Sequence, residues 1–225
     1  MTIEHRWDIP PKQAVQLQRE LADKVRIDPL QRDITLVSGT DCAFLGKKQV
    51  LAGAVLCDAQ SWDVLAAVDV VRPCLMPYVP GLLSFREAPA VIDAINALPE
   101  APDLLMCDGQ GLAHPRGMGL ASHVGLLTDL PTIGVAKSRY CGEHRQPGPN
   151  RGNRAQLKLD KKVIGTVLRT RTNVKPLFVS VGHRVTLGDA IRWTFRGAGK
   201  FRLPEPTRQA HLHVTRRKKE ILSQT

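Results

Sequence analysis

The sequence predicts an α/β protein with a mixed sheet and flanking helices, and three patterns support this fold class. Apolar segments at 34–44, 49–58 and 63–72 follow one another with only short turn-like stretches between them, which is typical of an antiparallel three-strand meander. Strand-like and helix-like segments alternate afterwards, as they do in sheets that contain parallel strands. Helical spacing of apolar residues near both ends of the chain adds the flanking helices.

The first helix is expected from Pro10 to about Ile27, because prolines open it and apolar residues then recur at helical spacing. A second helix is expected within 82–98, where Pro89 would be tolerated only near the helix start. The last helix begins at about Pro206 and ends in the basic sequence TRRKKE. The other predicted elements are strands at 103–108, 131–137, 156–160, 162–170 and 176–182, helices at 119–130 and 187–195, and a basic surface loop at 138–153.

The length of 225 residues and the hydrophobic content of 43% are enough to bury a core, and we expect residues 1–225 to form a single domain. No apolar run approaches the roughly 20 residues that cross a bilayer, and the charged N-terminal stretch lacks the apolar segment of a signal peptide. The five cysteines include no CxxC pair, and Cys42, Cys57 and Cys107 lie in apolar runs where a buried thiol is expected. These features favour a cytoplasmic protein without a structural zinc.

The net charge of +11 predicts attraction to a polyanion such as nucleic acid, although solubility alone would also account for it. Charge does not distinguish DNA, RNA, a ribosome or anionic lipid, but the lack of a long amphipathic basic helix disfavours a membrane partner. Aromatic residues make up only 4% of the chain, so nucleic-acid binding has to depend on a few well-placed rings and on backbone contacts.

Three acids are candidate ligands for the cation that phosphodiester hydrolysis requires. Asp41 interrupts an apolar strand, Asp108 ends another, and Glu87 lies at the start of a helix. Each has a plain alternative: Asp41 could face solvent from an edge strand, Asp108 could cap the turn at Gly109 and Gly111, and Glu87 could be a helix-start acid favoured by the dipole. A shared metal site explains all three acids together.

Two further polar residues near these acids are candidates for a role in catalysis. His114 precedes a proline in a glycine-rich loop, which favours an extended conformation from which its ring could relay a proton or orient water. Lys137 closes a strand on the same sheet edge as Asp108 and could contact a phosphate. The alternatives are a hydrogen-bonded structural histidine and a solvated lysine. Packing is the expected role of His123, on the following helix.

The sequence PYVP stiffens a loop with Pro77 and Pro80 on either side of Tyr78 and Val79. This arrangement is expected of an apolar wedge that enters a base stack. Taken alone, it would also fit a surface loop that packs its tyrosine on the fold.

Four segments, PYVPGLLSFREAPAV, DGQGLAHPRGMGLASHVGLL, PTIGVAKS and FRLPEPTRQAH, resemble the signature segments of the endonuclease V family in order and spacing. Together with GTDCAF the resemblance runs from Gly39 to His211. It implies a ribonuclease H-like fold. It also implies that Asp41 and Asp108 bind Mg²⁺, for which Mn²⁺ can substitute, and that Glu87 completes the cluster through a water molecule.

The resemblance further implies roles for residues around the acids. His114 and Lys137 would assist catalysis, His211 would support the acids, and Tyr78 would fill the gap left by a rotated lesion. The segment 141–161 matches no motif. Main-chain groups near five residues would line a hypoxanthine pocket: Gly81, Leu83, Gly109, Gly119 and Leu120.

The activity that the resemblance implies is repair of DNA that contains deoxyinosine or another deaminated base. Cleavage would fall at the second phosphodiester 3′ to the lesion, leaving 3′-hydroxyl and 5′-phosphate ends, and the enzyme is expected to be a monomer. Two alternatives stay open: a ribonuclease that cuts inosine-containing RNA, since the pocket reads a base and not a sugar, and a noncatalytic nucleic-acid-binding module of the same fold.

Overall fold

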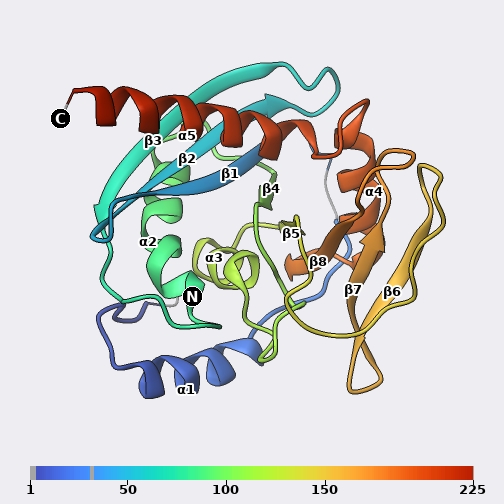
Figure 1. The fold of residues 1–225 in the computed structure, drawn as a ribbon, viewed down its shortest axis with the longest axis horizontal. Helices are drawn as coiled ribbons and strands as arrows, with labels where there is room; N and C mark the ends of the chain where they lie inside the picture. Colours follow the sequence, from blue (N-terminus) through green and yellow to red (C-terminus); the bar gives the residue numbers. More distant parts are fainter. Residues whose placement is uncertain (1–3, 31–32, 225) are drawn as a thin grey trace.

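A single eight-stranded sheet runs through the computed structural model, which describes residues 4–30 and 33–224 (Figure 1). The strand order is β3-β2-β1-β4-β5-β8-β7-β6. The strands are β1 (Leu36–Leu45), β2 (Gln49–Asp58), β3 (Val64–Pro73), β4 (Leu104–Cys107), β5 (Thr132–Ala136), β6 (Arg154–Leu159), β7 (Lys162–Leu168) and β8 (Leu177–His183). The helices are α1 (Pro11–Ala22), α2 (Leu83–Asn96), α3 (Leu120–Thr128), α4 (Leu187–Ala198) and α5 (Glu205–Ser223). The mixed α/β prediction is confirmed.

The predicted meander is present, with β1 antiparallel to β2 and β2 antiparallel to β3. From β1 the sheet continues through parallel pairs, first with β4 and then with β5. Crossovers through α2 and α3 make these parallel pairs possible, because a parallel connection needs a helix-length return. The carboxyl ends of β4 and β5 therefore meet at one edge of the sheet.

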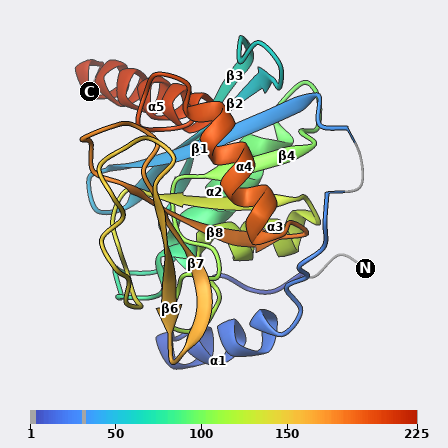
Figure 2. The same cartoon turned by 90° about the vertical axis from the view of Figure 1, so that its right-hand side faces the viewer.

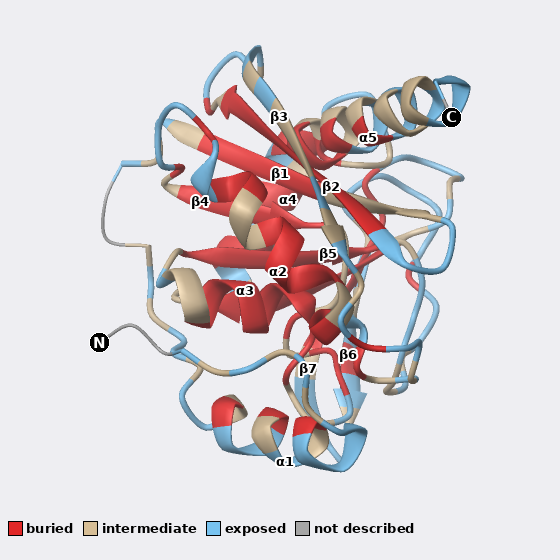
Figure 3. Ribbon diagram, turned by 90° about the vertical axis from the view of Figure 1, so that its left-hand side faces the viewer, coloured by how far each residue is buried: buried red, intermediate tan, exposed pale blue. Residues whose placement is uncertain are grey.

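Helices cover both faces of the sheet (Figures 1 and 2). On one face α2 packs against β2 and β3 while α3 packs against β4, β5 and β8, and on the other face α4 packs against β5, β7 and β8. Figure 3 shows that burial is concentrated in this sandwich, whereas the end of α5 is exposed. Because β4 and β5 are covered on both sides, they read in the sequence as continuous apolar runs.

α5 lies across β1 and β2, and two glycines allow it to come close. A Cβ atom on Gly39 would lie 2.1 Å from the carbonyl carbon of Pro206, and one on Gly53 would lie 2.5 Å from Cγ2 of Val214. Gly53 pairs with Asp41 across the β1–β2 ladder. The helix is therefore held directly above the acid.

Two boundary predictions were wrong. α1 ends at Ala22, five residues before the predicted end at Ile27, because the last apolar residues of the pattern continue into an extended segment. Pro89 lies inside α2, seven residues from its beginning, and not in the first turn. Pro89 is buried between the core residues Ala88 and Ala90, so packing offsets the backbone hydrogen bond that proline cannot make.

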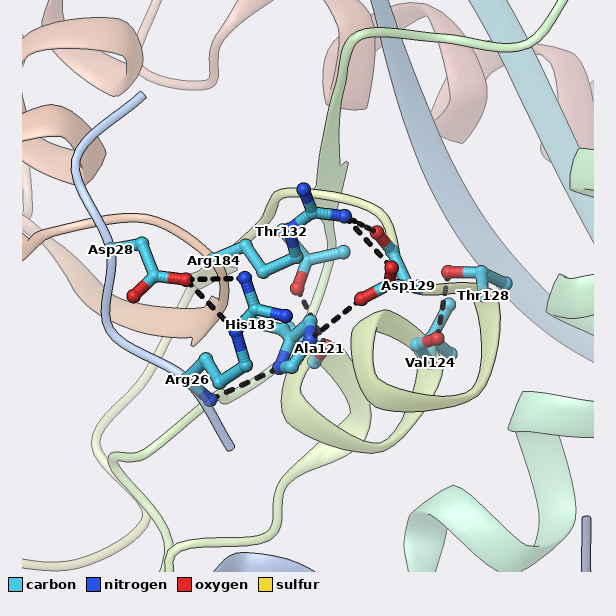
Figure 4. A network of polar contacts seen from close by, with 9 residues as sticks. All are labelled: Arg26, Asp28, Ala121, Val124, Thr128, Asp129, Thr132, His183 and Arg184. Carbon is cyan, nitrogen blue, oxygen red and sulfur yellow. Dashed lines mark hydrogen bonds and ion pairs between the residues drawn. The ribbon is translucent and has the colours of Figure 1, made fainter. Parts of the chain in front are cut away.

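The chain that follows α1 is fixed to the end of α3 by a polar network (Figure 4). The main-chain N–H of Arg26 donates to Nδ1 of His183, whose Nε2 lies 3.3 Å from Asp129. Arg184 donates to both the main chain and the carboxylate of Asp129. Asp129 has a positive φ of 53°, as the left-handed residue that ends a helix.

Cys57 and Cys107 are buried as expected, whereas Cys42 is only partly so, and the five thiols are free. In the described part of the chain, no helix combines the length and apolar character that crossing a membrane requires.

Candidate active site

Asp41 and Asp108 lie side by side where β4 ends. The last β1–β4 pair joins Thr40 to Cys107, and the N–H of Asp108 donates to the carbonyl of Thr40 at 3.1 Å. Residues one step beyond a parallel pair point to the same face, so the two carboxylates converge. β1 is an interior strand whose last residues extend past β4, so the interpretation of Asp41 as an edge-strand acid was wrong.

Glu87 approaches the same place from α2. It is 8% exposed and is the fifth residue of the helix, so a role as a first-turn acid is excluded. Burial and the negative charges of Asp41 and Asp108 raise the pKa of Glu87 to about 8. Burial and the charge of Asp41 also raise the pKa of Asp108, against the opposing effect of Lys137. Each carboxylate therefore disfavours the ionisation of its neighbours.

Two basic side chains face these acids. Lys137, just after β5, forms an ion pair with Asp108. His211 of α5 places Nδ1 2.7 Å from Oδ2 of Asp41. Lys137 therefore lies on the sheet edge where the sequence predicted it. Arg202 secures its main chain, because Nη2 of Arg202 donates to the carbonyl of Lys137 at 2.6 Å.

The three acids fit a hard cation by their chemistry, since carboxylate oxygens are the ligands such cations prefer and their mutual repulsion is relieved by positive charge. Among residues 4–30 and 33–224, however, no group of three Asp, Glu, His or Cys side chains is arranged closely enough to hold a metal ion as it stands. Asp108 is instead paired with Lys137, and Asp41 contacts His211. The assignment of all three acids as direct ligands stays a prediction.

A pocket of about 350 Å³ opens beside Asp108 and Lys137. Its wall contains all five residues predicted for the base pocket, together with Tyr78 and His114. Its remaining lining residues are Ser84, Gln110, Met118, Ala136, Ser138, Arg139 and Tyr140. The predicted pocket and one predicted metal-binding acid thus lie in a single cavity.

His114 is buried in the wall of this pocket and both its ring nitrogens are engaged. The main-chain N–H of Arg116 donates to Nδ1 at 3.2 Å, so Nε2 carries the proton and donates to the carbonyl of Gly81 at 3.1 Å. Burial, assisted by the charge of Arg116, lowers the pKa of His114 to about 4. The ring stacks on Tyr140, with centroids 5.4 Å apart. These contacts favour the structural alternative for His114 over proton transfer.

The PYVP loop presents its tyrosine to solvent. Tyr78 is 68% exposed and Pro77 and Pro80 are exposed as well, while Val79 packs partly on the small core around Leu82. The guanidinium carbon of Arg86 lies 5.8 Å from the centre of the Tyr78 ring. An exposed ring at the mouth of the pocket agrees with a wedge and not with a tyrosine packed on the fold. His123 is fully buried, as expected, and its Nδ1 contacts Ser84.

Gln110 and Tyr140 also line the pocket and were not among the residues predicted from the sequence. Gln110 lies in the DGQG segment, and its Nε2 donates to the carbonyl of Ser138 at 2.9 Å. Its Oε1 is buried and has no hydrogen-bond partner among the described residues. A polar side chain between two glycines at a strand end was the available signal for Gln110, whereas Tyr140 lies in a loop that gave none.

The order of the strands and the convergence of acids on two neighbouring parallel strands, beside a pocket large enough for a base, define a ribonuclease H-like fold with the acidic site typical of nucleases. The family model described as Endonuclease V matches residues 19–212. The chain belongs to the endonuclease V family and is a DNA repair endonuclease.

Individual relatives agree over nearly the whole chain. Endonuclease V of Azotobacter vinelandii is 48% identical over 212 residues, which cover 94% of this chain and 96% of the relative. The crystal structure of Endonuclease V from Streptomyces avermitilis has a TM-score of 0.91 at 44% identity and covers 99% of this chain and 100% of its own. A Ciona intestinalis Endonuclease V, solved with a DNA that contains an inosine, shares the fold with a TM-score of 0.80 at 23% identity, over 93% of this chain and 98% of its own.

Proposed function

We propose that the enzyme recognises deaminated bases in DNA, chiefly deoxyinosine, and hydrolyses the second phosphodiester bond on the 3′ side of the lesion. The observation that carries the proposal is the pocket of about 350 Å³ whose wall includes Asp108 and Lys137. A base inserted there would lie beside the acids, so the phosphate that is cut has to belong to a nearby nucleotide. The inosine-containing DNA bound by the Ciona intestinalis protein supports this choice of lesion for the fold.

Recognition requires the base to leave the stack, which costs a few kcal/mol and least for a weakly paired base such as hypoxanthine. The exposed Tyr78 is available to fill the vacated space. Main-chain groups around Gly81, Leu83, Gly109, Gly119 and Leu120, together with the unpartnered Oε1 of Gln110, would then test the donor and acceptor pattern of the base. Hypoxanthine carries an N1–H donor where adenine has an acceptor, so a buried acceptor would distinguish them.

Asp41, Asp108 and Glu87 would hold Mg²⁺, or Mn²⁺ in its place, as their hard oxygen ligands suit either ion. When bound, the cation would offset charge on the phosphate and favour ionisation of water. With the cation present, Lys137 would be free to move from Asp108 to a phosphate oxygen. His211 would keep one oxygen of Asp41 in place, and His114 would keep its neutral, donating form at the pocket wall.

The reaction is an in-line substitution at phosphorus. The oxygen of water forms the new P–O bond, the bond from phosphorus to the 3′ oxygen breaks, and the proton released by water balances the proton taken up by that oxygen. The products carry a 3′-hydroxyl and a 5′-phosphate. Lys137 would stabilise the charge that grows on the phosphate in the transition state.

We further propose that the chain acts as a single catalytic domain and as a monomer. The continuous sheet from β1 to β8, and α5 returning to cover β1, support one domain. Free thiols throughout the chain favour the reducing cytoplasm as the compartment.

A nicking assay tests the proposal. A labelled duplex with one deoxyinosine is incubated with Mg²⁺, with Mn²⁺ or with chelator, and the cut is mapped to nucleotide resolution. We expect a nick at the second phosphodiester 3′ to the lesion, between the first and second nucleotides that follow it. The nick should form only when metal is present. Absence of cleavage by folded protein would overturn the proposal. Matched inosine-containing RNA then tests the ribonuclease alternative, and binding without cleavage of either substrate would favour the noncatalytic alternative.

A further inference from the structure

One main-chain carbonyl, that of Gly81, accepts hydrogen bonds from three side chains. Nε2 of Gln18 donates to it at 3.0 Å, Nη2 of Arg116 at 2.8 Å and Nε2 of His114 at 3.1 Å. Gly81 immediately follows the PYVP loop and precedes α2, which carries Glu87. The carbonyl therefore lies at the junction between the exposed wedge and the helix that supplies an acid.

Gln18 comes from α1, which lies beneath the ends of α2 and α3 (Figure 3). Its side chain is 0% exposed and every polar group of its amide is used. Nε2 donates to the carbonyls of Gly81 and Met118, at 3.0 and 3.2 Å, and Oε1 accepts from Nε of Arg116 at 2.7 Å. The reversed amide would set its oxygen against two carbonyls and its N–H groups against a guanidinium, so this orientation is the one that the surroundings allow.

The conformation of Gly81 makes the junction specific. Its φ of +83° lies in the region that favours glycine, and a Cβ atom there would meet Nη2 of Arg116 at 2.5 Å. The loop is therefore held by the main-chain carbonyl of Gly81, at a position where the chain turns. Because glycine has no side chain, the three donor groups can approach this carbonyl together. The buried amide of Gln18 is favourable only when its donors are satisfied, and the carbonyls of Gly81 and Met118 accept from both of them.

We propose that Gln18, Arg116 and His114 form a clamp on the Gly81 carbonyl that positions the wedge loop against the pocket, so that α1 is part of the lesion-recognition apparatus. This inference rests on the proposed function of the site. The three are positioning residues, because their hydrogen bonds to Gly81 hold the loop and are not directed at the acids. Their effect is expected where a base has to be extruded from a duplex, since only a duplex leaves a gap for the wedge to fill.

The experiment compares Gln18→Ala with Gln16→Ala on the same helix. Gln16 is exposed and bonds only to Glu20 on its own helix, at 2.9 Å, so it is a matched control. Single-turnover nicking is measured over a range of enzyme concentrations, on deoxyinosine in a duplex and in a single strand. For Gln18→Ala we expect the half-saturating concentration on the duplex to rise about 10- to 100-fold, with the single-strand value and both saturating rates changed by less than about threefold.

A second readout needs no substrate. Amide hydrogen exchange in peptides covering 76–82 should be faster in Gln18→Ala than in the unchanged protein and in Gln16→Ala, because the loop loses one of its three anchors. If Gln18→Ala does not fold, Arg116→Lys carries the same comparison, since an ammonium keeps the charge but cannot span both Gln18 and Gly81 as the guanidinium does.

Equal losses on duplex and single strand, or a Gln18→Ala protein that behaves like Gln16→Ala in both readouts, would overturn the clamp. Failure of the unchanged protein to cut either substrate counts against the proposed function instead, and the exchange measurement still decides whether the clamp holds the loop. The two failures are therefore distinguishable.

Discussion

His211 and Asp41, which are 170 residues apart in the chain, meet with Nδ1 of the imidazole 2.7 Å from Oδ2 of the carboxylate. The close approach of α5 over Gly39 and Gly53 produces this contact. Asp41 is 12% exposed at its side chain and His211 is 47% exposed, so the histidine covers the acid from the solvent side. The contact fixes one oxygen of the carboxylate, Oδ2.

Replacing His211 with alanine should therefore impair the reaction without abolishing it. A side chain that orients a metal ligand typically contributes about 10- to 100-fold to activity or metal affinity. We expect His211→Ala to raise the Mg²⁺ concentration that gives half-maximal nicking and to lower the rate within that range. His213→Ala is the control, because His213 lies two residues further along α5 and contacts Asp69 instead. Equal behaviour of the two variants would show that the contact with Asp41 has no function.

Replacing Asp108 with alanine should abolish nicking while lesion binding persists. Asp108 is central to the cluster, next to Asp41 and paired with Lys137, and a metal ion contributes several kcal/mol to such a transition state. At about 1.4 kcal/mol per factor of ten, we expect a loss of about a thousandfold or more. Binding to a deoxyinosine duplex, measured in chelator, should change little, and loss of binding together with unfolding would instead indicate a structural role.

Glu87 should make the metal-free protein less stable at alkaline pH. The folded pKa of Glu87, about 8, is above its ordinary value of 4.5, so its contribution to stability is fully present below pH 4.5 and is lost as pH rises through about 8. Glu87→Gln mimics the protonated acid and should remove this dependence. The free energy of unfolding is measured with urea, in chelator, at pH 5 and pH 9. Relative to the unchanged protein, the variant should be more stable at pH 9 than at pH 5 by on the order of a few kcal/mol. A constant difference at both pH values would contradict the raised pKa.

Much of the fold was predictable because its sheet consists of apolar runs separated by short turns. The meander, the strands that end at Asp108 and Lys137, and α5 all followed from local patterns. The end of α1 was not, because its apolar spacing continues past Ala22 into a segment that tertiary contacts hold extended. Pro89 was misplaced for a similar reason, since core packing around it overrides the local preference.

The residues of the candidate site also fall into those that the sequence predicted and those that it did not. Acids that interrupt or end apolar runs stand out in the sequence, and Asp41 and Asp108 became candidates for that reason, whereas Glu87 became one as an acid expected at the start of a helix. Gln18 and Arg116 were not predicted, because a buried glutamine on a helix looks like any polar residue until its partners, up to 100 residues away, are known. The two ring contacts of His114 likewise become visible only in the folded chain.

Gln110 should contribute to the choice of base. Its Nε2 is fixed by the carbonyl of Ser138, which leaves the buried Oε1 as an acceptor for a donor on the extruded base. Gln110→Ala should weaken binding of a deoxyinosine duplex by about 1–3 kcal/mol, or roughly 5- to 150-fold. The comparison is a duplex with an abasic site at the same position, which offers no base and should bind both proteins alike. Parallel weakening on the two duplexes would mean that Gln110 supports the loop and does not contact the base.

His123 should make the protein lose stability in acid, opposite in sign to Glu87. The ring is fully buried between Ser84 and His5, and burial is the main cause that lowers its pKa to about 3, with the nearby His5 adding to it. Because the folded pKa is below the ordinary value of 6.5, the unfolded chain takes up a proton first as pH falls below 6.5, and the folded state is disfavoured. His123→Gln cannot titrate, so between pH 6 and 4 its free energy of unfolding should fall less steeply than that of the unchanged protein, by up to about 1.4 kcal/mol per pH unit. Parallel curves in urea unfolding over this range would show that His123 takes up its proton in the folded protein as readily as in the unfolded chain.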